Sequence, residues 1–172
     1  MQEEDNLGQS SYHRRVISHI LRFGRESPQK YLCADIGSQN PLYLSHPQTK
    51  RRRISPIQYE PDVYFTTKKK SKIVFEILDS EYKKTSEIIS DMIQCYLSPN
   101  VILIVLVVPV RDQQVEKRIL DTYEVIAGTL IYLKVNEDWI PKLAVCPILP
   151  VESVSYAKTK RVITKLQRTA KF

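Results

Sequence analysis

Two acidic residues stand where a β-hairpin would bring them side by side. Asp62 precedes a stretch of β-branched and aromatic residues, 63–65, and Glu76 lies within a second such stretch, 73–78. The polar segment 67–71 between them is typical of a turn, so this region predicts a hairpin. A hairpin that turns about the centre of that segment pairs positions whose numbers add up to 138, and Asp62 then faces Glu76.

Carboxylates paired in this way could hold a divalent cation. Side chains directly opposite each other have Cβ atoms about 4.5–5.5 Å apart, and two negative charges there repel unless something neutralises them. Mg²⁺ prefers carboxylate oxygens and waters, and a bound metal can activate a water and stabilise charge developing on a phosphate. Glu60, two residues before Asp62, would point to the same face and supply a third oxygen. The spacing fits an exposed acidic spot equally well, because a one-residue shift in register would remove the pairing with Glu76.

Other kinds of site are not indicated. The three cysteines are widely spaced without a CxxC pair, so neither a disulfide framework nor a structural zinc site is predicted. We expect His13, His19 and His46 at the surface or half-buried. None of the four glycines belongs to a phosphate-cradling loop or a nucleophile elbow.

The elements before the hairpin begin with a helix. Ser10 or Ser11 can cap it, the apolar residues of 12–23 follow a 3.6-residue period, and Gly24 can end it. Prolines punctuate residues 25–60, where we expect at least one strand.

The elements after the hairpin alternate between helix and strand. The pattern predicts a helix over about 79–97, a central strand at 101–110 that is apolar on both faces, a helix over 113–124 and a strand at 129–135. Residues 151–172 predict a basic amphipathic helix that lies on the domain or on a partner. The alternation is typical of an α/β fold with helices packed on a sheet.

A chain of 172 residues fits one domain. We expect an acidic N-terminal tail at 1–9, an α/β domain at 10–150 and the basic helix or tail at 151–172. The apolar segment 139–151 is a candidate contact for a second copy or a protein partner. The longest apolar run has ten residues, short of the roughly 18 that a membrane-spanning helix needs, and the N-terminus resembles no targeting signal, so we expect an intracellular protein.

The net charge of +7 is concentrated in two basic blocks, at 50–70 and 157–172. Such blocks are typical of a polyanion-binding surface, although each taken alone fits a solvated loop or tail equally well. The segment Lys50–Arg53 also has the composition of a nuclear-import signal. The candidate nucleic-acid contacts are Arg51, Arg52, Arg53, Lys68, Lys69, Lys70, Lys158, Lys160, Arg161, Lys165 and Arg168.

The arrangement resembles the core of the PD-(D/E)xK nucleases, also called restriction-endonuclease-like. The resemblance rests on Pro61-Asp62, a turn, a strand with Glu76, a long helix and a very hydrophobic strand, and by element order it covers about residues 10–135. It implies a restriction-endonuclease-like α/β core, with a central mixed sheet flanked by helices. It also implies that Asp62 and Glu76 bind metal and that a basic surface binds DNA or RNA.

The sequence departs from that pattern at one position. The family lysine two residues after the second acid, which positions or deprotonates the attacking water, is replaced by Leu78. Some families of this group carry the lysine on the following helix, and some read Glu-x-Leu, as a widespread bacterial group of putative endonucleases does. The resemblance therefore implies that Lys83 or Lys84 takes that role, although both also fit an ordinary solvated first turn.

Three functions follow as hypotheses. The first is a nuclease that cuts phosphodiesters, with DNA as the expected substrate and with Mg²⁺ or Mn²⁺ held by Asp62 and Glu76, assisted by Glu60. The second is a nuclease-fold protein without catalysis that binds nucleic acid or serves in an assembly. The third is an interaction domain whose basic C-terminal helix binds an acidic partner or membrane surface.

Overall fold

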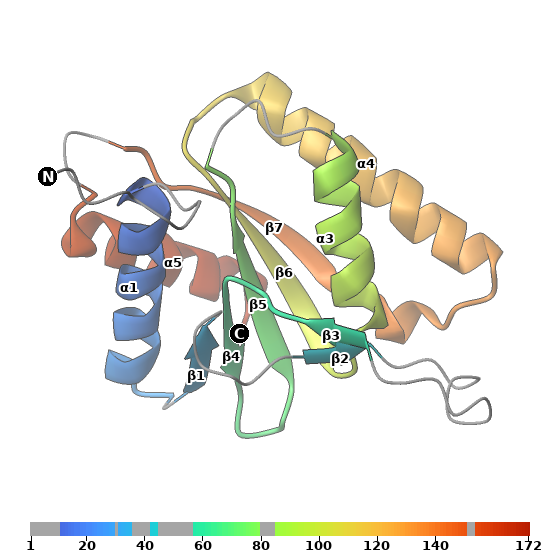
Figure 1. Cartoon of the computed structure of the whole chain (residues 1–172), viewed down its shortest axis with the longest axis horizontal. Helices are drawn as coiled ribbons and strands as arrows, with labels where there is room; N and C mark the ends of the chain where they lie inside the picture. Colours follow the sequence, from blue (N-terminus) through green and yellow to red (C-terminus); the bar gives the residue numbers. More distant parts are fainter. Residues whose placement is uncertain (1–10, 30, 36–41, 45–56, 80–84, 151–153) are drawn as a thin grey trace, which may run out of the picture.

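The computed structural model describes residues 11–29, 31–35, 42–44, 57–79, 85–150 and 154–172 (Figure 1). The elements in chain order are α1 (Ser11–Glu26), β1 (Leu32–Asp35), β2 (Leu42–Leu44), β3 (Ile57–Tyr59), β4 (Val63–Thr66), β5 (Lys72–Ile77), α3 (Thr85–Leu97), β6 (Val101–Val108), α4 (Gln113–Tyr132), a 3-10 turn η1 (Glu137–Trp139), β7 (Lys142–Pro147) and α5 (Tyr156–Ala170). None of these helices is long and apolar enough to cross a bilayer.

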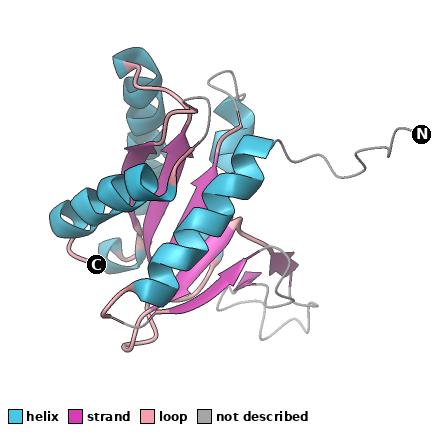
Figure 2. Cartoon of the chain, turned by 90° about the vertical axis from the view of Figure 1, so that its left-hand side faces the viewer, coloured by secondary structure: helices cyan, strands magenta, loops and turns pink. Residues whose placement is uncertain are grey.

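Five strands form a mixed sheet in the order β1-β4-β5-β6-β7. Strand β4 pairs with β1 and with β5 in antiparallel orientation, whereas β6 pairs with β5 and with β7 in parallel orientation. Helices α1 and α5 cover one face and α3 and α4 the other, while β2 and β3 pair separately (Figures 1 and 2). The prediction of an α/β fold with a mixed sheet flanked by helices is confirmed.

The predicted hairpin register is also confirmed. Strand β4 pairs with β5 so that Val63 faces Phe75 and Thr66 faces Lys72. The turn closes with hydrogen bonds from the backbone N–H of Lys70 to the carbonyl of Thr67 and from Thr67 to Ser71. Extending the register by one residue sets Asp62 opposite Glu76.

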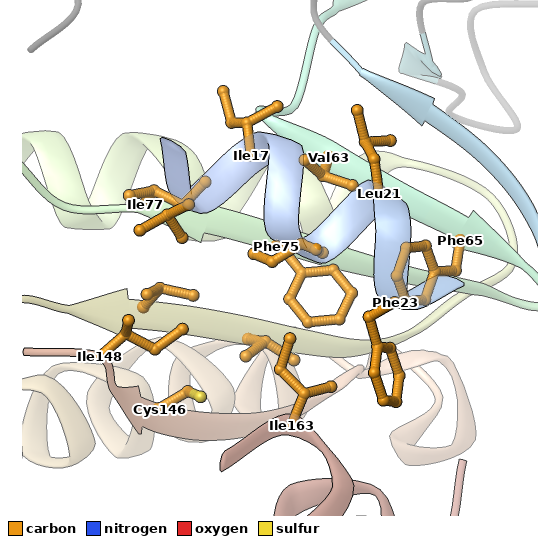
Figure 3. Close-up of a cluster of buried hydrophobic side chains, with 14 of the residues drawn as sticks. Ile17, Leu21, Phe23, Val63, Phe65, Phe75, Ile77, Cys146, Ile148 and Ile163 are labelled. Carbon is orange, nitrogen blue, oxygen red and sulfur yellow. The ribbon is translucent and has the colours of Figure 1, made fainter. Parts of the chain in front are cut away.

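Two hydrophobic cores hold the layers together. The α1/α5 side contains the odd-numbered residues of β5, including Phe75, which is fully buried against Phe65 (Figure 3). The α3/α4 side contains the even-numbered Val74 and, just beyond the strand, Leu78. Strand β6 contributes to both cores, as predicted for a central strand. Burying each large apolar side chain stabilises the fold by about 1.5–3 kcal/mol.

Gly24 does not end the first helix, contrary to the prediction. α1 continues to Glu26, and a Cβ at position 24 would lie 2.4 Å from the Cys33 sulfur and 2.7 Å from the Phe65 ring. The glycine is therefore required by the close approach of α1 to the sheet.

The predicted strand at 129–135 is wrong. α4 runs without a break from Gln113 to Tyr132, with Ile119 and Ile126 buried against the sheet and Leu130, one turn further on, packed partly against the same core. The fifth strand of the sheet is instead β7, which lies within the apolar segment 139–151, the predicted candidate contact for a partner. Strand β7 lies beside β6, so most of that segment is part of the sheet.

The basic C-terminal helix α5 lies on the domain. Ser155 caps it by accepting a hydrogen bond from the Lys158 N–H, and Ile163 is fully buried against the sheet. Tyr156 donates a hydrogen bond to Glu26 at 2.5 Å, and its ring lies under the Arg22 guanidinium, which joins α5 to α1.

Candidate functional site

Asp62 has a defined position at the start of β4. Its Oδ2 accepts a hydrogen bond from the Ile77 backbone N–H at 2.7 Å and lies 3.0 Å from His13 Nε2. The Asp62 side chain is 13% exposed. This carboxylate is therefore tied both to β5, at the peptide that follows Glu76, and to helix α1.

His13 is the site residue that sequence reasoning missed. We expected a surface or half-buried histidine, but His13 is 5% exposed. It lies on the buried face of α1, three and four residues before Val16 and Ile17, and this spacing was the available signal. A histidine on an apolar helix face needs a polar partner, and Asp62 is one.

Glu76 is buried on the opposite face of the sheet, 7% exposed. The Tyr59 hydroxyl, brought there by β3, donates to Glu76 Oε1 and lies 3.2 Å from the Cys95 sulfur of α3. Burial raises the pKa of Tyr59, and the nearby charge of Glu76 raises it further. Burial and the same carboxylate raise the pKa of Cys95. Both groups therefore stay protonated, and Tyr59 remains a hydrogen-bond donor to Glu76.

The position of the family lysine is a core position in this chain. Leu78 is 1% exposed in the core on the α3/α4 side, and its backbone N–H donates to the Val107 carbonyl at 2.9 Å. Lys83 and Lys84, which the resemblance nominates instead, lie outside the described residues.

Of the three predicted metal ligands, only the carboxylates of Asp62 and Glu76 are suited to hold Mg²⁺. Glu60 is exposed, and the described part of the chain contains no three His, Cys, Asp or Glu side chains close enough to hold one metal ion. Mg²⁺ is commonly bound by one or two carboxylates, with waters and substrate phosphates completing the shell, so Asp62 and Glu76 have suitable chemistry. Their present contacts lie on opposite faces of the sheet, and a shared cation has to compete with His13 for Asp62 Oδ2.

The four helices of the described residues, α1, α3, α4 and α5, all begin at the edge of the sheet where Asp62 and Glu76 lie, which we call the carboxyl edge. Helices α3, α4 and α5 each follow the carboxyl end of a parallel strand, and α1 reaches the same edge through the contact between His13 and Asp62 (Figure 1). Helix N-termini carry partial positive charge, so this edge is electrostatically suited to a polyanion.

The predicted basic residues are distributed over both ends of the sheet. Lys158 and Arg161 lie exposed near the start of α5, at the carboxyl edge, and Lys165 and Arg168 follow along the helix. Lys160 forms an ion pair with Glu26 at 3.6 Å. The lysines at 68–70 are exposed in the β4–β5 turn, at the opposite end, which we call the turn edge. Arg51, Arg52 and Arg53, and with them the predicted import signal, lie outside the described residues.

Comparisons with protein-family models, curated proteins and solved structures give no match. The functional argument therefore depends on this chain's own residues.

Proposed function

We propose that this chain is a restriction-endonuclease-like domain that hydrolyses phosphodiester bonds in nucleic acid, with Asp62 and Glu76 as ligands for a divalent cation. The observation that carries the proposal is the β4–β5 register, which pairs the two acidic positions as the sequence pattern requires. The register sets the two positions opposite each other, while the Asp62 carboxylate contacts His13 on the α1 side and the Glu76 carboxylate contacts Tyr59 on the α3 side. The mixed sheet flanked by helices agrees with the core that the resemblance implies.

The chain's own groups orient both carboxylates. The Ile77 N–H and His13 hold Asp62, and the Tyr59 hydroxyl holds Glu76. Such supporting contacts reduce the freedom of ligand side chains and so favour a preorganised site. Bound Mg²⁺ or Mn²⁺ would supply an activated water and charge stabilisation at the phosphate. Lys83 or Lys84 remains the predicted group that positions the water.

A second function is favoured by the burial of Leu78 and by the contacts that already engage both acids. In this alternative the chain binds nucleic acid without cutting it, and the acidic pair contributes to folding. Binding would then be independent of metal, whereas the nuclease needs the metal for cleavage.

A cleavage assay with matched variants tests the proposal. Single- and double-stranded DNA and RNA are incubated with Mg²⁺ or Mn²⁺ and with the wild type, Asp62→Asn, Glu76→Gln or the control Glu137→Gln, which changes an exposed acid far along the chain. We expect both site variants to lose at least about a hundredfold in rate, because removing one essential charged group costs on the order of 3 kcal/mol at the transition state. Unchanged cleavage in Asp62→Asn overturns the nuclease assignment. Binding without cleavage by the wild type supports the second function instead.

A further inference from the structure

A pocket of about 300 Å³ lies at the carboxyl edge, between the end of β7 and the start of α5. Three exposed cations surround it: Arg111 follows β6, and Lys158 and Arg161 lie three residues apart on one side of α5. Its floor includes Ile148 and Val154, which are buried.

The three cations have no acidic partner within the described part of the chain. The ion pairs there use other groups, including the neighbouring Lys160, whose ammonium lies 3.6 Å from Glu26. The positive charges around the pocket are therefore available to a ligand, and their spacing around one hollow concentrates them.

The pocket is linked through helix α1 to Asp62, one member of the acidic pair. The Tyr12 hydroxyl donates to the carbonyl of Ile148, in the pocket floor, at 2.5 Å. The next residue, His13, contacts Asp62 at 3.0 Å. Two adjacent residues of α1 therefore contact the pocket floor and the Asp62 carboxylate, which lie at the same edge of the sheet with β5 and β6 between their strands.

We propose that this pocket binds phosphates of the nucleic-acid backbone at the same edge of the sheet as the acidic pair; the inference rests on the proposed function in taking nucleic acid as the partner. Arginine pairs with phosphate oxygens through two parallel hydrogen bonds, and lysine adds a point charge. Three cations exceed what one phosphate requires, whereas a backbone presents a charge about every 3.4 Å along each strand. Arg111, which the sequence did not single out, thereby becomes a nucleic-acid contact.

Binding without catalysis tests the inference separately from the nuclease assignment. Fluorescence anisotropy measures the affinity of a labelled DNA duplex in chelator for the wild type and for the triple variant Arg111→Gln/Lys158→Gln/Arg161→Gln. The control, Lys134→Gln/Lys142→Gln/Lys171→Gln, removes the same charge from exposed lysines toward the turn edge.

We expect the pocket variant to lose at least tenfold in affinity. The slope of log K against log salt concentration should become shallower by about 2–3, since each phosphate contact contributes about 0.9 to that slope. The control should change less than threefold. Equal losses in the two variants overturn the pocket, because net charge alone would then explain binding. Loss confined to the pocket variant, with no cleavage by the wild type, keeps the pocket and rejects the nuclease. Stabilisation of the wild type by inorganic phosphate without DNA binding would identify a small phosphorylated ligand and overturn the nucleic-acid assignment.

Discussion

The two ends of the sheet both carry exposed cations around a pocket, but they differ in their acidic residues and in which helix ends they hold. The carboxyl edge combines Asp62, Glu76, four helix N-termini and a pocket ringed by cations. The turn edge has exposed lysines at 68–70 and 142, a pocket lined by Lys68, Lys69 and Lys171, and the ends of α4 and α5, but neither of the two paired acids. The difference shows that a basic block in a sequence does not define a site. In this fold the parallel crossovers decide which end gains the helix N-termini.

The strongest effect should follow from restoring the family lysine. Leu78→Lys would bury an ammonium in an apolar core, so we expect the free energy of unfolding to fall by about 3 kcal/mol or more. Urea denaturation measures it, with Leu120→Lys on the exposed side of α4 as the control. A stable variant with increased cleavage would show instead that position 78 belongs to the site.

A smaller loss should follow from removing the hydrogen bond to Glu76. Tyr59→Phe leaves a buried carboxylate without this donor, which costs about 1–3 kcal/mol of stability. Tyr132→Phe, at an 85% exposed position, should be neutral in the same denaturation experiment. If the two substitutions are equivalent, Tyr59 does not support Glu76.

A single substitution at each edge sharpens the contrast in binding. Arg111→Gln should weaken the binding of a DNA duplex about fivefold, in proportion to a charged hydrogen bond worth roughly 1 kcal/mol in an open pocket. Lys134→Gln removes the same charge and should have no measurable effect. Anisotropy titration at fixed salt measures both, and the reverse order would move the binding surface to the turn edge.

The smallest expected effect is a pH-dependent change in stability at the α1/α5 interface, whose two helices begin at the carboxyl edge. Burial lowers the pKa of His19 below its ordinary value of 6.5, and the nearby Arg22 lowers it further. The unfolded chain therefore binds a proton at His19 more readily than the folded chain does. The contribution of neutral His19 to stability is complete above pH 6.5 and is lost as the pH falls toward the folded-state pKa. Thermal unfolding between pH 7.5 and 5 should show a small loss of stability that His19→Gln abolishes. A wild-type curve as flat as the variant's would contradict the assignment.

The sequence was informative where local signals agreed. The polar turn at 67–71 and the alternation on both sides of it sufficed to predict the register that pairs Asp62 with Glu76. The apolar run at 101–108 likewise predicted a central strand, because only a strand covered on both faces tolerates such a run.

Prediction failed where tertiary contacts override local preference. Residues 129–132 have strand-like side chains, yet they continue α4 because Ile119 and Ile126 anchor the helix to the sheet. The apolar residues of β7 are bounded by prolines, a strand signal that we did not use. His13 could be recognised only by its place on the buried stripe of α1, and its contact with Asp62 depends on packing between elements far apart in the sequence.

One measurement tests the account most directly. Amide chemical shifts of the isotopically labelled protein are recorded while a short DNA duplex is added, which maps the contact residue by residue. We predict that the shifts cluster at the carboxyl edge, at Arg111, Ile148 and Lys158, and that Ile77 beside the acidic pair responds as well. A cluster at Lys69, Lys142 and Lys171, with the carboxyl edge unmoved, would contradict the account.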